Sequence, residues 1–315
     1  MNLGLGIGIP FQRKRGGAAP FVGLLDEVPG AAFAASMRLL RNGYSGGLAR
    51  VIAYDGATQQ GAADIMPYKI GNEYWIDLNS SLENLDATAT GRGLTTSDTL
   101  ADLCSVGVDD YDGLVTNLYD QGLSPNHAAQ TNISTMPKLV DAGGLVTENG
   151  KPALDFSGSK NMFLAPLGVI SDITTYTVVK MTSTGSLTAI YSFDNGTYGA
   201  WANIIVGRTF SNQHQIFQRT TGNTFLSGNE AENLMQLLRV DSFSANDFLK
   251  IRQNTNENQL THSQGAFNAD THATLGFSPA NTNYLTNFKM QSLISYFDAF
   301  NSDVESNINN AFSIY

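Results

Sequence analysis

The segment Leu114–Gly158 constrains the fold most, because short apolar runs alternate with turn signals along it. It opens with an apolar run rich in strand-forming residues, and two further short runs, Lys138–Val140 and Leu145–Val146, flank a Gly-Gly pair. The last run, Ala153–Phe156, follows Asn149-Gly150, and Asn-Gly between apolar runs is the strongest short-range signal for a hairpin. The segment therefore predicts antiparallel β-structure.

Strand candidates recur at short spacing after residue 159, and turn residues separate them. This pattern predicts a β-sandwich or jelly roll. Only 15% of the residues are charged, whereas 42% are hydrophobic. Such a low charged fraction is typical of all-β chains with many turns. The predicted strands are Thr174–Met181, Ala189–Phe193, Ala202–Val206, Gln215–Gln218, Leu234–Val240, Phe248–Arg252, Ala273–Phe277 and Asn287–Phe297. A helix is predicted over Ser302–Ile314, with Ser302 as its N-cap and Glu305 completing a capping box.

The region before residue 114 is mixed. Phe33, Met37, Leu40 and Tyr44 form one apolar stripe at helical spacing, which predicts a helix over residues 26–44. Strands are expected at Leu48–Tyr54 and Tyr74–Leu78, a loop over residues 79–97, and a short helix over Ser97–Val106 that turns Cys104 inward as a small hydrophobe.

Residues 1–20 are expected to form an N-terminal anchoring arm. Five apolar side chains, Leu3, Leu5, Ile7, Ile9 and Phe11, alternate with glycine and other residues, so an extended strand would have one apolar face. We expect this arm to add to the sheet of a partner; the alternative is a disordered tail. The basic triplet Arg13-Lys14-Arg15 follows the apolar run instead of preceding it, so no signal peptide is expected.

Composition disfavours several classes of function. The formal net charge of −10 disfavours nucleic acid as a partner, because an acidic surface repels phosphate. One cysteine leaves no intrachain disulfide and no cysteine-based zinc site. The four histidines lack metal-binding spacing, and no apolar run is long enough to span a membrane, so we expect no metal, no cofactor and no membrane span.

Two segments resemble known families. Residues 34–65, which contain Tyr44-Ser45-Gly46-Gly47-Leu48-Ala49-Arg50-Val51, together with Asn117–Gln130 (NLYDQGLSPNHAAQ), resemble the N-terminal part of the family 54 α-L-arabinofuranosidase catalytic domain. Pro137–Gly158, with VTENGKPAL at its centre, is similar to segments of phage and bacterial surface proteins. Phe288–Tyr315 looks like the last strand and helix of laminin-G-like, concanavalin-type sandwiches.

The resemblance implies an all-β, concanavalin/laminin-G-like jelly-roll β-sandwich with a few short helices and an extended N-terminal arm. The expected divisions are residues 1–20 as the arm, 21–130 as a strand-and-helix segment packed on the sandwich, and 131–315 as the sandwich. The family's vicinal cysteine pair is absent here, and no pair of acids is singled out as catalytic, although a glycosidase needs two carboxylates across a cleft.

The first expectation for function is a bacteriophage virion structural protein, such as a tail fibre, a head fibre or a capsid decoration. It would contact other virion proteins through residues 1–20, form a homo-oligomer with a trimer favoured, and present a surface to a cell-surface glycan. It would be assembled in the host cytoplasm and reside in the virion. The alternatives are a glycoside hydrolase of arabinofuranosidase type and a stand-alone carbohydrate-binding module.

Sugar contacts are predicted where polar and aromatic residues follow strands, because sugars stack on aromatic rings and bind amide and carboxylate groups. An alternative for the acid in the Tyr-Asp-Gln motif is structural: aspartate in such a turn usually accepts backbone N–H bonds. The predicted carbohydrate-binding residues are Tyr119, Asp120, Gln121, Asn126, His127, Tyr198 and Trp201.

Overall fold

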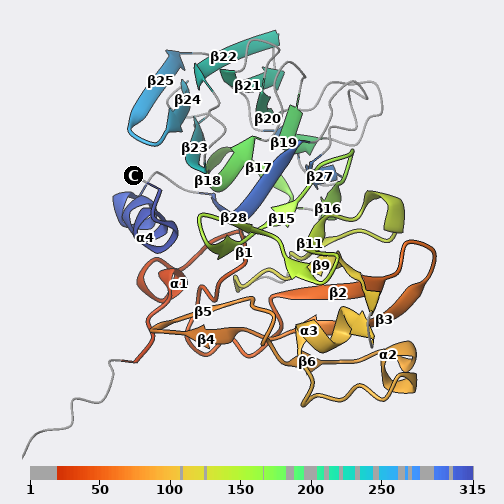
Figure 1. Cartoon of the computed structure of the whole chain (residues 1–315). Helices are drawn as coiled ribbons and strands as arrows, with labels where there is room; N and C mark the ends of the chain where they lie inside the picture. Colours follow the sequence, from red (N-terminus) through yellow and green to blue (C-terminus); the bar gives the residue numbers. More distant parts are fainter. Residues whose placement is uncertain are drawn as a thin grey trace, which may run out of the picture.

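The computed structural model of the chain is a β-sandwich with few helices (Figure 1). It describes residues 20–106, 109–123, 126–165, 167–181, 188–194, 204–208, 213–219, 223–230, 235–243, 248–261, 267–268, 272–276, 287–297 and 301–314. Among these residues, no helix has both the length and the apolar character needed to cross a membrane.

The first of two antiparallel ladders contains the long strand β28, which lies next to the edge strand β1. On one side β28 pairs with β18, and on the other it pairs with both β1 and β15. The order is β1 (Phe33–Ser36), β28 (Phe288–Tyr296), β18 (Asp172–Met181), β23 (Gln236–Phe243), β24 (Phe248–Gln253) and β25 (Asn256–Thr261).

A second antiparallel ladder lies against the first. Its order is β6 (Leu82–Glu83), β3 (Gln59–Ile65), β2 (Ala49–Tyr54), β9 (Asp112–Leu118), β10 (Ala128–Ala129), β16 (Met162–Leu164), β27 (His272–Leu275), β19 (Thr188–Asp194), β20 (Ile204–Arg208), β21 (Gln213–Arg219) and β22 (Asn223–Glu230).

Short strands join the two ladders into one sheet system. β11 (Lys138–Asp141) pairs with β9 and with β15 (Leu154–Asp155), and β15 pairs with β28. The strand β12 (Gly144–Leu145) extends β11 as a hairpin. Four further pairs stand apart: β4 (Tyr68–Ile70) with β5 (Glu73–Trp75), β7 (Ser105–Val106) with β8 (Asp109–Asp110), β13 (Thr147–Glu148) with β14 (Lys151–Pro152), and β17 (Val169–Ile170) with β26 (Phe267–Asn268).

The described helices are short except at the C-terminus. They are α1 (Leu24–Glu27), α2 (Ala87–Gly91), α3 (Leu100–Leu103), α4 (Ser302–Phe312) and the 3₁₀ turn η1 (Ile133–Thr135). Asn301 caps α4, since its side chain accepts a hydrogen bond from the backbone N–H of Asp303 at 2.8 Å. The helix therefore begins at the expected position, but Asn301 takes the capping role that was predicted for Ser302.

The central strands are buried on both faces. The main core lies between the ladders and includes Val115, Leu118, Met290 and Leu293. A second cluster lies on the other face of β18 and β28, where Ile294 and neighbouring side chains pack against the buried stripe of α4. Side chains along a strand point alternately to the two faces of the sheet. Since each face of β28 packs on its own core, all but one residue of this strand are buried.

The Asn-Gly hairpin predicted within the Leu114–Gly158 segment is confirmed. Asn149 and Gly150 have φ values of 49° and 69°, the left-handed conformation that a two-residue turn of this kind requires. The preceding Glu148 fastens the hairpin to the sandwich, since its carboxylate pairs with Lys180 at 2.8 Å and with Lys289 at 2.9 Å. The two lysines come from adjacent strands, β18 and β28, so the hairpin bridges them.

The helix predicted over residues 26–44 is wrong. Phe33–Ser36 is instead the strand β1, which pairs with β28 and is buried along its whole length. The helix before it spans only Leu24–Glu27, and Gly30 follows with φ of 92°, outside the range of a right-handed helix. Pairing with a strand some 260 residues away has overridden the local helical spacing.

Smaller corrections concern the neighbouring segments. The helix expected over Ser97–Val106 is the single turn α3, which Thr99 caps. The strand expected over Tyr74–Leu78 ends at Trp75, and residues 79–97 hold β6 and α2 in addition to loop. Strand pairing connects residues before and after position 130, because β9 pairs with β11 and β1 pairs with β28. The expected division of the chain at residue 130 stays a prediction. The arm residues Leu3, Leu5, Ile7, Ile9 and Phe11 lie outside the described residues.

Cys104 is the buried small hydrophobe that the sequence predicts, with no exposed surface. Burial raises the pKa of its thiol to about 12, so almost no reactive thiolate forms near neutral pH. We expect a thiol reagent such as Ellman's reagent at pH 8 to leave the folded chain unmodified and to label one thiol per chain after denaturation. Rapid labelling without denaturant would contradict this burial.

Candidate functional site

A cleft of about 370 Å³ lies where four neighbouring strands, β2, β9, β11 and β15, run side by side. Strand register brings its residues together: Tyr54 in β2 stands opposite Asp112 in β9, and Lys138 in β11 stands between Leu114 and Asp155. We call this site the four-strand cleft; it is lined by Tyr54, Asp112, Leu114, Ile133, Ser134, Lys138, Asp141, Asp155, Ser157 and Lys160.

The floor of the four-strand cleft is apolar. Leu114 is buried in a small cluster with Ile52, Ala62 and Met136, separate from the two larger cores. Tyr54 and Ile133 are partly buried against this cluster, so each keeps some surface toward solvent. The floor thus offers an aromatic ring and aliphatic groups to a ligand that has an apolar face.

Charged groups form the wall above this floor. The Lys138 ammonium lies 2.9 Å from an Asp112 carboxylate oxygen and 2.7 Å from one of Asp141. Its hydrogen bond holds the pKa of the Asp141 carboxyl below its ordinary value, so this carboxylate stays charged at neutral pH and accepts hydrogen bonds. The other oxygen of Asp112 accepts from the backbone N–H of Ala142 at 3.0 Å, and the other oxygen of Asp141 adds an acceptor to the wall.

Lys160 completes the charged wall from the loop after β15. Its ammonium donates to the backbone carbonyl of Ser134 at 2.8 Å, which ties this loop to η1. Partial burial, followed by the nearby charge of Lys138, lowers the pKa of Lys160. Asp155 uses one oxygen to accept from the backbone N–H of Ser157 at 2.8 Å. The four-strand cleft therefore combines three carboxylates, two ammonium groups and a tyrosine ring.

Five of the residues predicted to bind sugar lie together elsewhere, in the turn after β9. The Asp120 carboxylate accepts backbone N–H bonds from Ala34, Gly122 and Asn126 at 2.8 to 3.0 Å. The backbone N–H of Asp120 donates to Nδ1 of His127 at 3.0 Å. Asp120 is only 2% exposed. Its carboxylate therefore ties the turn to β1, which is the structural role given above as the alternative to sugar contact. The buried side chain has no surface to offer to a sugar.

Gln121 has the same kind of role. Its side chain accepts from the backbone N–H of Leu40 at 2.7 Å and donates to the carbonyl of Arg38 at 2.9 Å, and it has no exposed surface. Asp120 and Gln121 thus hold the fold together in this structure, and sugar contact at either residue stays a prediction. Tyr119 and Asn126 are partly exposed, but each donates a hydrogen bond inward, Tyr119 to Asp64 and Asn126 to the carbonyl of Ala32.

The remaining predicted residues are not tested by this geometry. Contact of a sugar with Tyr119, Asn126 or the partly exposed His127 stays a prediction. Tyr198 and Trp201 lie outside the described residues. Among the residues that the structure describes, no group of three or more His, Cys, Asp and Glu side chains is placed to hold a metal ion.

Sequence reasoning did not find the four-strand cleft. None of the residues that line it was singled out as a site residue. The sequence holds only a weak signal for this site. Lys138 and Asp141 are three residues apart on one short strand, so their side chains would point to opposite faces of a regular strand. A bulge or a strand end is needed to bring the lysine to the carboxylate. Their meeting with Tyr54 depends on strand register, which short-range sequence patterns do not encode.

No family model matches this chain, and no curated protein matches it. Among solved structures, it is similar to a mutant of a GH54 α-L-arabinofuranosidase soaked with 4-nitrophenyl α-L-arabinofuranoside, with a TM-score of 0.56. It is similarly close to an arabinofuranosidase complexed with arabinofuranosyl-α-1,2-xylobiose, with a TM-score of 0.57. Both matches have 16% sequence identity and cover 90% of this chain and 62% of the other chain.

The chain thus shares a β-sandwich fold with GH54 arabinofuranosidases and spans about 62% of their length. The fold resemblance inferred from the sequence is confirmed at this level. Since one fold can carry many functions, the similarity by itself assigns neither an activity nor a ligand.

Proposed function

We propose that this chain is a glycan-binding protein and that the four-strand cleft is its binding site. The observation that carries the proposal is the apolar floor of Tyr54, Leu114 and Ile133 beneath a wall of carboxylates and ammonium groups. A pyranose or furanose ring has the same division, with C–H groups on its faces and hydroxyl groups at its edge. The tyrosine ring would pack on a sugar face while the wall hydrogen-bonds its hydroxyls.

The charge arrangement favours binding over hydrolysis. A glycosidase needs one carboxyl group that keeps its proton until it protonates the leaving oxygen. In the four-strand cleft, Lys138 pairs with both Asp112 and Asp141, and the pKa of Asp141 is lowered. With its lowered pKa, the Asp141 carboxylate accepts hydrogen bonds from hydroxyl groups and is a poor proton donor. Hydrolysis of the arabinofuranosidase type is therefore the second candidate, supported by the fold alone.

The proposed setting is the bacteriophage virion, with the chain as a tail fibre, head fibre or capsid decoration. This part is supported by the sequence: the similarity of Pro137–Gly158 to phage surface proteins and the alternating apolar residues of the arm. In this setting, residues 1–20 would contact other virion proteins, the assembly would be a homo-oligomer such as a trimer, and the cleft would contact a glycan of the host surface.

We expect Tyr54→Ala to weaken glycan binding about tenfold or more, which corresponds to about 1.4 kcal/mol. The cause is the loss of the ring from the cleft floor. A glycan array, followed by affinity electrophoresis on arabinoxylan and arabinan, measures this; arabinose polymers come first because the similar structures hold arabinofuranosides. Tyr68→Ala is the matched control, since Tyr68 is 41% exposed and does not line the cleft.

Two results would contradict the proposal. One is an absence of binding across the array at millimolar glycan; the other is an equal loss in Tyr54→Ala and Tyr68→Ala. The same preparation should be incubated with 4-nitrophenyl α-L-arabinofuranoside. Release of nitrophenol that Asp141→Asn or Asp155→Asn abolishes would establish the hydrolase instead.

A further inference from the structure

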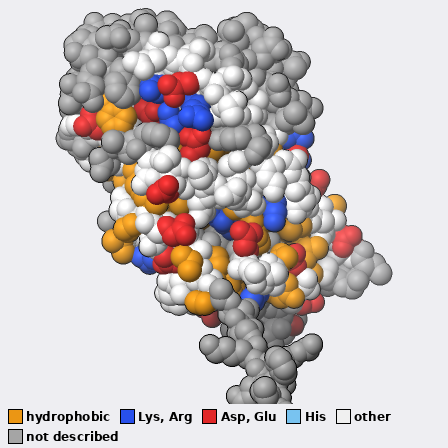
Figure 2. Space-filling model, turned by 90° about the vertical axis from the view of Figure 1, so that its left-hand side faces the viewer, with side chains coloured by type: hydrophobic (Ala, Val, Ile, Leu, Met, Phe, Trp, Pro, Cys, Tyr) orange, Lys and Arg blue, Asp and Glu red, His pale blue; other side chains and the backbone are white. Residues whose placement is uncertain are grey.

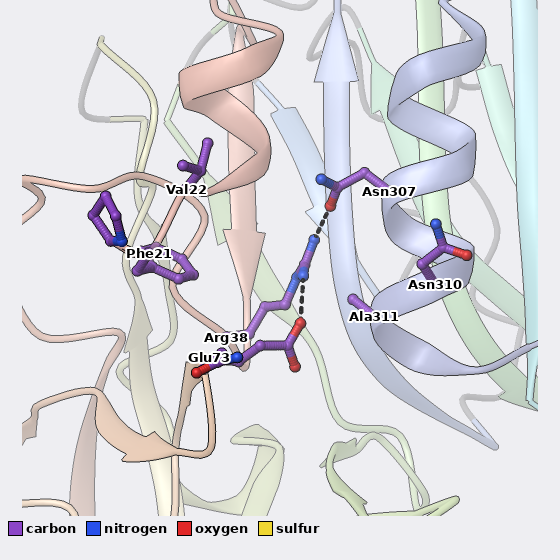
Figure 3. Close-up of a pocket in the computed structure, with 9 residues that line it drawn as sticks. Phe21, Val22, Arg38, Glu73, Asn307, Asn310 and Ala311 are labelled. Carbon is purple, nitrogen blue, oxygen red and sulfur yellow. Dashed lines mark hydrogen bonds and ion pairs between the residues drawn. The ribbon is translucent and has the colours of Figure 1, made fainter. Parts of the chain in front are cut away.

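A second cavity, of about 340 Å³, lies where the chain enters the described part of the molecule. Phe21 and Val22 form one wall, and Asn310 and Ala311 of α4 form the opposite wall (Figure 3). Its size is at the lower end of the range for ligand sites, about 300 to 1,000 Å³. We call it the entry pocket; it shares no lining residue with the four-strand cleft.

The floor of the entry pocket is the guanidinium of Arg38, which is nearly buried. It lies 3.4 Å from a carboxylate oxygen of Glu73 and donates to the side-chain oxygen of Asn307 (Figure 3). Asn307 in turn donates to Glu27 at 3.0 Å. Burial lowers the pKa of Arg38 to about 10, so it remains charged at neutral pH. Because Glu73 and Glu27 compensate this charge, the floor suits an uncharged ligand better than an anion.

The walls offer groups that no other part of the described chain uses. The exposed amides of Asn72 and Asn310 have no hydrogen-bond partner within the described residues. Val22 is 55% exposed, although it is aliphatic. Free amides beside aliphatic surface match an extended polypeptide, whose backbone needs hydrogen-bond partners while alternate side chains need apolar contacts.

We propose that the entry pocket is the docking site for Leu3–Phe11, the apolar part of this chain's own N-terminal arm. This segment carries no charge, and its aliphatic side chains alternate along it, so one face of an extended strand would contact Val22 and Ala311. Eight residues separate Phe11 from Pro20, which is itself in the pocket wall. They span roughly 25 Å when extended, enough to bring the segment back to the pocket or into that of a neighbouring copy.

Charge supports the same occupant. The basic triplet Arg13-Lys14-Arg15 follows the uncharged segment, and it would lie at the rim while the segment fills the pocket. Asp26 and Glu27 are exposed next to this rim, where Glu27 contacts Asn307 of the pocket lining. A short tether also raises the effective concentration of the arm to about the millimolar range, so a weak contact is enough for docking.

Cross-linking of the full-length chain tests the proposal. Gly8→Cys keeps every apolar side chain of the arm, Asn310→Cys places the second thiol in the pocket, and the buried Cys104 does not interfere. The control pairs Gly8→Cys with Ser302→Cys, an exposed position eight residues earlier on α4 that does not line the pocket. With a short bis-maleimide, we expect the Asn310 pair to cross-link at least ten times faster than the Ser302 pair.

Equal rates for the two pairs would overturn the proposal, because an undocked arm reaches both positions. Val22→Asp in the Asn310 pair should lower its rate to that of the control, while Leu123→Asp, at a 77% exposed position outside the entry pocket, should not. An unchanged rate in Val22→Asp would place the contact outside the pocket and would also overturn the proposal. The mass of the product shows whether the arm docks on its own copy or on a neighbour. Glycan binding is a separate measurement, so either proposal can fail alone.

Discussion

Replacing Arg239 with methionine should lower the free energy of unfolding by about 3 to 5 kcal/mol, the usual cost of removing one partner from a buried ion pair. The Arg239 side chain is 3% exposed and pairs with three carboxylates, those of Asp241, Glu257 and Glu305, at 2.8 to 3.0 Å. Asp241 and Glu305 are themselves buried. Without the guanidinium, these charges lose their central partner while they remain out of water. Urea unfolding followed by circular dichroism measures the change.

The network connects elements that are distant in sequence, because Arg239 lies in β23, Glu257 in β25 and Glu305 in α4. Figure 2 shows acidic and basic side chains gathered on the upper part of one face of the molecule. Lys250 and Arg252 add ion pairs to Glu257 and Glu305 of the network. Arg239→Lys is the matched control: it keeps the charge but loses the planar fork, so its loss should be smaller than that of methionine. Unchanged stability in Arg239→Met would contradict a structural role for the network.

The fold could be predicted where local signals agree with long-range pairing. The strands β2, β18 and β28 combine apolar residues with flanking turn residues, and the sequence placed each within two residues of its observed ends. Among the strands that the sequence missed, β22 and β25 are mostly polar. Partners in the sheet, and not their own composition, make these segments strands.

The prediction of a helix over residues 26–44 failed for a related physical reason. Phe33 and Met37 have helical spacing, but both faces of β1 are buried, so a periodic apolar stripe is not required there. Small residues between them allow close contact with β28. A fully buried strand and an apolar helix look alike over four residues, and only pairing across the chain separates them.

Prediction of the candidate site was limited by register. Tyr54 meets Asp112, and Lys138 meets Asp155, only because four strands align across the sheet. A shift of one residue in any of these strands would turn its side chains to the opposite face. The local half of the Asp120 turn was predictable, since aspartate often accepts the N–H two residues on. Its bond to Ala34, 86 residues away, was not.

That bond leads to the second large effect: Asp120→Ala should lower the free energy of unfolding by about 2 to 5 kcal/mol. The substitution removes the acceptor for three backbone N–H groups, and a buried donor without a partner costs about 1 to 3 kcal/mol. The N–H of Ala34 is fully buried in β1, next to the strand pairing with β28. Loss of this acceptor should therefore loosen β1. Hydrogen exchange at the amides of residues 33–36 would detect the loosening, and urea unfolding would measure the change in free energy.

Asp120→Asn separates geometry from charge. One carboxylate oxygen accepts from both Ala34 and Gly122, and the other accepts only from Asn126 at 3.0 Å. Asparagine keeps the first oxygen but turns an NH₂ group toward the Asn126 N–H, so its loss should be smaller than that of alanine. Equal losses in both variants would show that the carboxylate does not hold the turn through these bonds.

The pH dependence gives an independent check of the same residue. Burial raises the pKa of the Asp120 carboxyl above its ordinary value of 3.8, which outweighs the opposing effect of the three N–H donors. The folded chain therefore binds this proton more tightly than the unfolded chain does. The stability that this group contributes is fully present below pH 3.8 and is lost as the pH rises through the folded pKa.

The difference in unfolding free energy between wild type and Asp120→Asn should accordingly shrink as the pH rises from about 4. A difference that grows over this range would mean that the carboxylate is stabilised by its hydrogen bonds more than it is destabilised by burial.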